Sequence, residues 1–199
     1  MKFPDRYEEA QSLGEFEVLT LGGHHLVITQ ALERTSSKGN PMIELSLDTA
    51  PNDTQPGFCR KKYDRIPVKE NQVKRWPQEG KYYVNVADKD GNTSPSFKNL
   101  VMNLEKSNPG FVVPRVDFSP LIFKGKKIGG VYGAETDYYD GKEYTRHKIF
   151  FFCDDTKIEE VKIPAPRETA AHKEWKSYTS GGSADWSTMD ADLEGLPFN

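Results

Sequence analysis

Hydrophobic and polar residues alternate with a period of two along several segments of the chain, a pattern typical of half-buried strands. The clearest example is the pair of segments HHLVITQAL at 24–32 and MIELSL at 42–47, which flank a Gly-Asn turn. Alternation on both sides of such a turn predicts a β-hairpin. In the second segment Ile43, Leu45 and Leu47 face one side of the strand, opposite Met42, Glu44 and Ser46.

Further segments predict the other strands of a sheet. The dipeptide Asp140-Gly141 lies between two of them and indicates a second hairpin. The proline-rich stretch 49–71 predicts a long loop that encloses one or two short strands. The remaining strands are expected at 81–87, 121–133 and 144–153, with a first pairing segment at 16–20 and an edge strand at 157–163.

One segment changes to a helical period. Ser94 suits the N-cap and Pro95 the first helical position, while the sequence NPG at 108–110 ends the run. This pattern predicts one amphipathic helix of about three turns. Its apolar positions follow the spacing i, i+3, i+4 and i+7 and are Phe97, Leu100, Val101 and Leu104.

The order of these elements predicts the fold class. Several short strands with a single helix between the third and fourth strong ones favour a mainly β protein, an OB-fold-like five-stranded barrel with one helix. Another β-barrel or a sandwich with one helix fits the same periodicity. The predicted organisation is an OB-fold domain at 1–165, a linker at 166–182 and a disordered acidic tail at 183–199.

Charge is distributed unevenly along the chain. The formal net charge is −3, with 27 basic and 30 acidic residues. Four of the acidic residues follow Gly181 and no basic residue does, so the preceding part of the chain is close to neutral. The end of the chain has too little apolar content to fold alone, and its carboxylates are suited to steering it toward basic surfaces. We expect it to bind partner proteins through Asp190, Asp192, Leu193, Glu194, Leu196, Pro197 and Phe198.

Four segments of the predicted domain combine cations with aromatic rings. A protein that binds single strands needs cations near the phosphates and exposed rings on which bases stack. Basic residues on strands also serve solubility, and rings of a small barrel often fill its core. Tyr82 and Tyr83 face opposite sides of one strand, so at most one of them is expected to stack on a base. The candidate contacts are Arg60, Lys61, Lys62 and Tyr63; Lys74, Arg75, Trp76, Lys81, Tyr82 and Tyr83; Lys124, Lys126, Lys127 and Tyr132; and Tyr144, Arg146, Lys148 and Phe150.

The sequence offers no arrangement that indicates catalysis, a metal or a cofactor. His24 and His25 are adjacent, and in a strand they face opposite sides, so they cannot bind one metal together. Cys59 and Cys153 lie far apart and are expected to be reduced thiols. The beginning of the chain has early acids and no apolar run, so we expect no signal peptide, no membrane association and a cytoplasmic location.

Several segments carry a resemblance to a known family. LVITQALERTSSKGNPMIELSLD, SFKNLVMNLEKSNPGF, LIFKGKKIGGVYG and the acidic end with LPF resemble the single-stranded DNA-binding proteins that tailed bacteriophages encode. The likeness covers roughly residues 15–165 and the tail. It implies an OB-fold that coats single strands in DNA replication, recombination and repair in the cytoplasm of the host bacterium. It also implies that the acidic tail recruits replication and recombination proteins.

Two further hypotheses stay open at this stage. One is a β-barrel adaptor that recruits replication or recombination enzymes and does not itself bind DNA. The other is a nuclease or another DNA-processing enzyme, which no acidic cluster in the sequence supports. The assembly is equally open, and a homodimer is one of the forms that edge-strand pairing allows.

Overall fold

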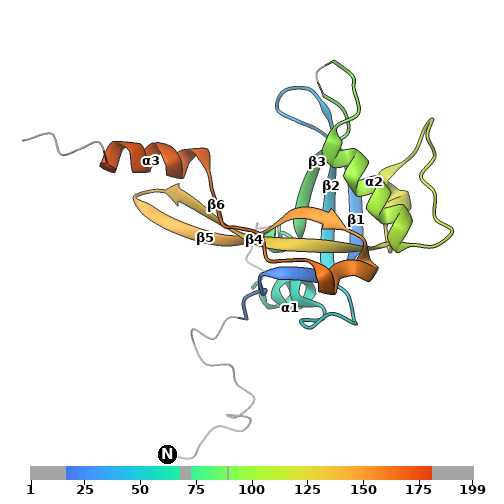
Figure 1. The fold of residues 1–199 in the computed structure, drawn as a ribbon, viewed down its shortest axis with the longest axis horizontal. Coiled ribbons are helices and arrows are strands. Elements are labelled where there is room, and N and C mark those ends of the chain that lie inside the picture. The colour runs from blue at the N-terminus through green and yellow to red at the C-terminus, as the bar shows by residue number, and fades with distance from the viewer. Residues whose placement is uncertain (1–16, 68–72, 89, 181–199) are drawn as a thin grey trace, which may run out of the picture. The chain divides into compact units, whose positions relative to one another are not determined.

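A computed structural model describes residues 17–67, 73–88 and 90–180 of the chain (Figure 1). The strands are β1 (Gly22–Thr35), β2 (Pro41–Thr49), β3 (Lys81–Asn85), β4 (Lys127–Tyr139), β5 (Lys142–Cys153) and β6 (Arg167–Glu168). The helices are α1 (Phe58–Arg65), α2 (Pro95–Ser107) and α3 (Ala170–Ser180). Short 3-10 segments are η1 (Gln78–Gly80), η2 (Pro120–Phe123) and η3 (Asp155–Glu160).

The predicted hairpin at the start of the chain is confirmed. β1 and β2 pair antiparallel from Thr35 opposite Pro41 onward, around a turn in which Gly39 has a φ of 82°. The pairing register shifts between Ile28 and Gln30, where β1 carries a bulge. Beyond the bulge, β1 also pairs with β4, from Gly22 opposite Tyr132 to Val27 opposite Lys127. The long strand β1 therefore pairs with β2 on one side and with β4 on the other.

The sheet is open. Its strand order is β3-β2-β1-β4-β5, and the short strand β6 pairs parallel to β4. β3 and β5 are the two ends of this order, so the described strands do not close into a barrel. The described part of the chain is mixed α/β, with an open six-stranded sheet and three α-helices where one was expected. The prediction of a β-rich sheet is confirmed, and the predictions of a mainly β protein and of a closed barrel are wrong.

Side chains occupy the place where β3 and β5 would have paired. The rings of Tyr82 in β3 and Phe152 in β5 meet edge to face, with centroids 4.7 Å apart. The carbonyl of Phe152 accepts a hydrogen bond of 3.1 Å from the side-chain amide of Asn103 in α2. Because the helix satisfies this carbonyl, β5 does not need β3 as a hydrogen-bonding partner there.

The predicted helix at 94–108 is confirmed as α2. The side chain of Ser94 accepts a hydrogen bond from the backbone N–H of Phe97, and Pro95 occupies the first turn. Leu100 and Leu104 are fully buried, so the apolar stripe of α2 packs on the sheet. Together with the inward side chains of β1 and β2, these leucines belong to one hydrophobic core.

Four local predictions are corrected. The stretch 49–71 holds the helix α1 in place of short strands, and its last four residues lie outside the described ones. Segment 157–163 was expected as an edge strand, but residues up to Glu160 form the 3-10 segment η3. Segment 121–133 begins in η2 and becomes a strand only at Lys127. Residues 17–20 form no strand, because β1 begins at Gly22.

The chain divides into two compact units. The first takes residues up to Gly133 together with His147–Pro164, and the second takes Ala134–Arg146 together with the chain from Ala165 onward. In the second unit, Trp175 of α3 stacks on Tyr138 of β4 with centroids 4.4 Å apart. The segment predicted as a linker thus contains β6 and α3, whereas the predicted tail at 183–199 lies outside the described residues.

Candidate nucleic-acid interface

One face of the strands β1, β2 and β3 is turned away from the core. Strand pairing places Gln30 opposite Ser46, and Ser46 also opposite Lys81, so these three side chains share a face. Ile43, Leu45 and Leu47 are buried on the other face, in the hydrophobic core. The outer face carries Gln30, Leu32 and Arg34 of β1, Met42, Glu44 and Ser46 of β2, and Lys81, Tyr83 and Asn85 of β3.

A hollow of about 350 Å³ lies beside this face. Its floor includes Gln30 and Ser46, and its walls come from α1, from the segment before η1 and from the residue that follows η2. Three cations and two rings line it, and none of its lining residues is a carboxylate. These five side chains, which we call the cationic-aromatic cluster, are Arg60, Tyr63, Lys74, Trp76 and Lys124.

Two of the three cations of this cluster lie against its rings. The Lys74 ammonium is 4.5 Å from the centroid of the Tyr63 ring, and the Arg60 guanidinium is 5.4 Å from that of Trp76. The two rings are themselves in contact, with centroids 5.3 Å apart. Such distances fall in the range of cation–π attraction. The positive charges are thereby held next to the surfaces on which a base would stack.

Trp76 is held at its polar edge. Its indole Nε1 donates a hydrogen bond of 2.9 Å to the carbonyl of Leu47 in β2. A tryptophan has this one donor and no acceptor, so the ring has no hydrogen-bonding group left for a ligand. Trp76 is therefore suited to act as a fixed apolar platform.

Lys124 reaches the hollow because its loop is hydrogen-bonded to the bulge of β1. Gly125 donates its N–H to the carbonyl of Ile28 at 2.7 Å, and Ile28 donates its own to the carbonyl of Lys126 at 3.0 Å. These two bonds fix the backbone on the C-terminal side of Lys124. The bulge that re-aims β1 thus also brings the third cation to the cluster.

The structure brings together residues from three of the four predicted segments. Arg60 and Tyr63 come from the first, Lys74 and Trp76 from the second, and Lys124 from the third. Among the remaining predicted residues of α1 and of the segment before η1, Lys61 and Arg75 are exposed. Lys62 forms an ion pair with Glu79 instead.

The predicted tyrosines separate into exposed and buried ones. Tyr83 is 49% exposed on the outer face, whereas Tyr82 packs against the core, as the alternation within the strand required. Tyr132 is 1% exposed, and its hydroxyl donates to the carbonyl of Glu79 at 2.9 Å. Burial raises the pKa of Tyr132 well above its usual value. Tyr132 is a core residue, and its prediction as a DNA contact is wrong.

Other predicted contacts lie outside the hollow. The Lys126 ammonium sits 4.4 Å from the ring centroid of Phe111, in a separate depression that Lys127 also lines. Lys148 and Phe150 belong to the first unit and are half-buried, with the ring of Phe150 lying against Gly133. Two exposed residues of the second unit complete the predicted set, Tyr144 and Arg146.

A carboxylate on the outer face is neutralised by two cations. Glu44 accepts from Lys81 and from Arg34, each at 2.8 Å. The hydrogen bond from Lys81 lowers the pKa of Glu44, burial opposes this effect, and the bond from Arg34 adds to it. The same bond to Glu44 raises the pKa of Lys81. Lys81 is thus engaged by Glu44 and is less available to a phosphate than the three cations of the cluster.

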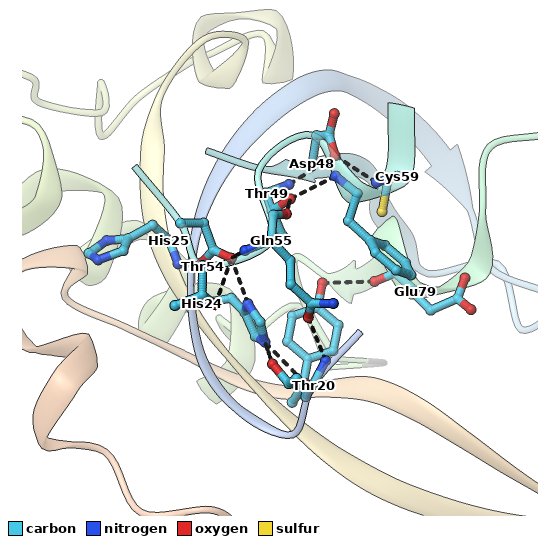
Figure 2. A network of polar contacts seen from close by, with 12 residues as sticks. Thr20, His24, His25, Asp48, Thr49, Thr54, Gln55, Cys59 and Glu79 are labelled. Atoms are coloured by element: carbon cyan, nitrogen blue, oxygen red, sulfur yellow. Dashed lines mark hydrogen bonds and ion pairs between the residues drawn. The ribbon is translucent and has the colours of Figure 1, made fainter. Parts of the chain in front are cut away.

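The helix α1, which carries Arg60 and Tyr63, is positioned by polar side chains of β2 (Figure 2). Asp48 accepts from the N–H of Cys59 at 2.8 Å, and the hydroxyl of Thr49 accepts from the N–H of Phe58 at 2.9 Å. These bonds satisfy N–H groups that a helix start leaves without internal partners. Burial raises the pKa of Asp48, although the backbone donors oppose the shift.

A second buried carboxylate, Asp53, ties the loop before α1 to β1. Its partners His24, His25 and Gln55 are labelled in Figure 2. Asp53 contacts the Nδ1 atom of His24 at 3.0 Å and accepts from the N–H groups of His25 and Gln55, each at 2.8 Å. Burial alone would raise the pKa of Asp53, but these hydrogen bonds outweigh it and the pKa lies below its usual value. Asp53 is therefore ionised at neutral pH and holds the loop in place.

We expect Asp53→Asn to destabilise the protein by about 3 kcal/mol at pH 7, because it removes a buried, hydrogen-bonded carboxylate and turns an amide donor toward backbone donors. A carboxyl whose pKa is lowered in the folded state stabilises the protein fully at a pH above its unfolded-state pKa of about 4. This stabilisation is lost as the pH falls through the lowered pKa of the folded state. The difference in the free energy of unfolding between the wild type and the Asp53→Asn variant should therefore become smaller as the pH falls. Urea unfolding at pH 7 and pH 3.5 measures it. Equal stability at pH 7 would contradict the role given to Asp53.

Sequence reasoning did not single out three further residues of the hollow. Thr29 occupies the bulge of β1, and Gln30 and Ser46 are paired neighbours on the outer face. The polar side of the 42–47 alternation already marked Ser46 as facing away from the core. No pattern in the sequence showed that Gln30 would lie beside it, because this depends on the position of the bulge.

Comparisons with known proteins leave the site to be interpreted from its geometry. No protein-family model matches the chain, and a search of curated proteins finds no match. Within the described residues, no helix combines the length and apolar character needed to cross a bilayer. In the same part of the chain no three His, Cys, Asp or Glu side chains gather as a metal-binding group, and both cysteines are free thiols.

Proposed function

We propose that this protein binds single-stranded DNA and has no catalytic activity. The observation that carries the proposal is the cationic-aromatic cluster, in which three cations and two rings meet around one hollow without a carboxylate. Phosphates need cations that are not already paired with acids, and bases need apolar ring faces. Lys61, Arg75 and Tyr83 are exposed and extend the same chemistry beyond the hollow.

Binding on this surface requires the cations to change partners. Arg60 and Lys74 now lie over the rings of Trp76 and Tyr63. When a strand arrives, its phosphates attract both cations away, and a base takes the ring face that they leave. The contacts join cations to phosphates and rings to bases, so we expect the affinity for single-stranded DNA to fall steeply as salt is added. For nucleotides that bind outside the hollow, we expect the affinity to depend little on the base sequence.

The connectivity of the sheet supports an OB-type fold that is partly open. α2 lies between β3 and β4 in the chain, and β1 pairs with both β2 and β4. OB-folds bind oligonucleotides on their sheet face and with the loops beside it. This placement agrees with a hollow next to β1 and β2. The resemblance to phage single-stranded DNA-binding proteins is part of the same proposal, as is recruitment of replication and recombination proteins by residues 190–198.

Intrinsic fluorescence tests the proposed function. In a variant with Trp175→Phe and Trp186→Phe, Trp76 is the remaining tryptophan. We expect an oligo-dT of 20 nucleotides to quench its emission, because a base stacks in the hollow beside it, and the quenching to reverse when salt is added. Anisotropy of a labelled oligo-dT measures binding independently. Unchanged emission together with unchanged anisotropy at low salt would contradict DNA binding.

A protein adaptor is the second candidate, and one observation favours it. A hollow of about 390 Å³ lies between α2 and the segment 111–118 and is lined mainly by apolar side chains. Met102 is 44% exposed and Val116 is 90% exposed there. Exposed apolar surface of this kind often marks a protein-binding site. If the protein is an adaptor only, oligo-dT leaves both signals of the fluorescence experiment unchanged.

A further inference from the structure

The floor of the hollow carries two polar groups without hydrogen-bonding partners. Ser46 is 6% exposed, and within the described residues its hydroxyl contacts no donor or acceptor, although its carbonyl accepts from Thr29 at 2.9 Å. Gln30, its paired neighbour on β1, is exposed, and its amide has no partner among the described residues either. Both side chains line the hollow.

The Ser46 hydroxyl still reaches solvent, because it is not among the buried polar atoms that lack a hydrogen-bonding partner. A ligand that displaces this solvent has to replace its hydrogen bonds. Two neighbouring polar groups already have partners in the protein. Thr29 donates its hydroxyl to β2, and the indole of Trp76 donates to Leu47. Ser46 and Gln30 are therefore neutral polar groups of the two strands that can hydrogen-bond a ligand in the hollow.

These two groups have the chemistry of base recognition. A hydroxyl both donates and accepts, and a primary amide offers donors and an acceptor side by side. The edge of every nucleobase likewise presents donors and acceptors. A phosphate, by contrast, is an acceptor only and suits the cations of the cluster. The lining of the hollow thus offers both kinds of group that a nucleotide needs, cations for the phosphate and neutral polar side chains for the base.

The hollow is large enough for a small ligand group. A volume of about 350 Å³ is at the lower end of pockets that bind small molecules. Trp76 and Tyr63 supply the apolar side, and their ring planes are inclined by 37° to each other. A single base entering between these rings and the strands would meet ring surface on its face and polar groups on its edge.

We infer that the hollow takes one nucleobase of a bound single strand, whose edge is hydrogen-bonded by the Gln30 amide and the Ser46 hydroxyl. The inference rests on the proposed function and sharpens it, because it makes one nucleotide position depend on base chemistry. Sites built to hydrogen-bond a group reject analogues that lack it, since their own polar groups are then left unpaired. At this position the protein reads the edge of the base as well as its face.

The experiment compares two ligands of equal shape. One is oligo-dT, and the other is the same oligomer with difluorotoluene, an apolar isostere of thymine, at every position. Each is titrated by anisotropy against the full chain, against a Gln30→Leu, Ser46→Ala double variant and against the control Asn85→Leu. Asn85 is exposed on the outer face and does not line the hollow.

We expect the wild type and the control to bind oligo-dT about tenfold more tightly than the isostere. In the double variant this ratio should fall to about one through loss of oligo-dT affinity, while affinity for the isostere stays unchanged. Equal losses for both oligomers would show that Gln30 and Ser46 act only through structure, and would overturn the inference. Failure of the wild type to bind either oligomer would overturn the proposed function instead. Thermal unfolding shows whether the variants are folded.

Discussion

Replacing Arg60, Lys74 and Lys124 together by alanine will weaken binding to oligo-dT by about 100-fold at moderate salt and flatten its salt dependence. The three cations line one hollow and face no carboxylate in it, so each is available to a phosphate. Each phosphate contact on a single strand contributes about 0.7 to the slope of log K against log salt, so three contacts contribute about 2. Anisotropy titrations at four salt concentrations measure both quantities.

A matched variant separates the site from net charge. Lys38, Lys98 and Lys157 are exposed elsewhere in the first unit, and replacing them by alanine removes the same total charge. We expect this control to lose less than fivefold in affinity and to keep nearly the wild-type slope, because long-range attraction is screened beyond about 10 Å at 0.1 M salt. Equal effects of the two triple variants would mean that the cluster is not the phosphate-binding site.

Elements defined by neighbouring residues were predictable from the sequence. The β1–β2 hairpin follows from alternation and a Gly-Asn turn, and α2 follows from a cap, a proline and a regular apolar stripe. In each case the signals lie within about ten residues of the element. The same alternation correctly separated Tyr82 from Tyr83 as facing opposite sides.

Elements that depend on distant residues were not predictable in this way. α1 has exposed cations at four of its eight positions, and its start is satisfied by Asp48 and Thr49, about ten residues earlier in the chain. A contact near the open edge of the sheet likewise joins distant residues, because the Asn103 amide of α2 donates to the Phe152 carbonyl of β5, 49 residues away in the chain. Neither contact leaves a pattern in its own segment.

The candidate site shows the same division. Cation-rich and ring-rich segments could be recognised one at a time, but their meeting depends on the bulge of β1 and on the position of α1. The sequence also did not show which of the predicted side chains would be buried. Tyr132 follows a basic segment as an exposed ring would, and only the fold places it beneath Glu79. Strand parity indicates two faces and does not tell which of them the rest of the chain covers.

Gly80→Ala will destabilise the protein by about 3 kcal/mol, lower its unfolding temperature by about 10 °C and weaken DNA binding as well. Gly80 is the last residue of η1 and lies next to Leu47 of β2, whose carbonyl accepts the hydrogen bond from Trp76. A Cβ atom there would lie 2.4 Å from the carbonyl oxygen of Leu47 and 2.6 Å from the indole nitrogen of Trp76. These are the two atoms of the hydrogen bond that fixes Trp76, so the methyl group cannot be accommodated without breaking it.

The control for this substitution is Gly39→Ala in the β1–β2 turn. A Cβ at Gly39 meets nothing within 4 Å, but its φ of +82° is unfavourable for alanine, which costs about 1 kcal/mol. Thermal unfolding should therefore show a drop about three times larger for Gly80→Ala, and only this variant should shift the emission of a protein whose remaining tryptophan is Trp76. Since the platform and the fold share one hydrogen bond, loss of stability and loss of DNA affinity must occur together. A Gly80→Ala protein that is as stable as Gly39→Ala and binds DNA like the wild type would refute this coupling.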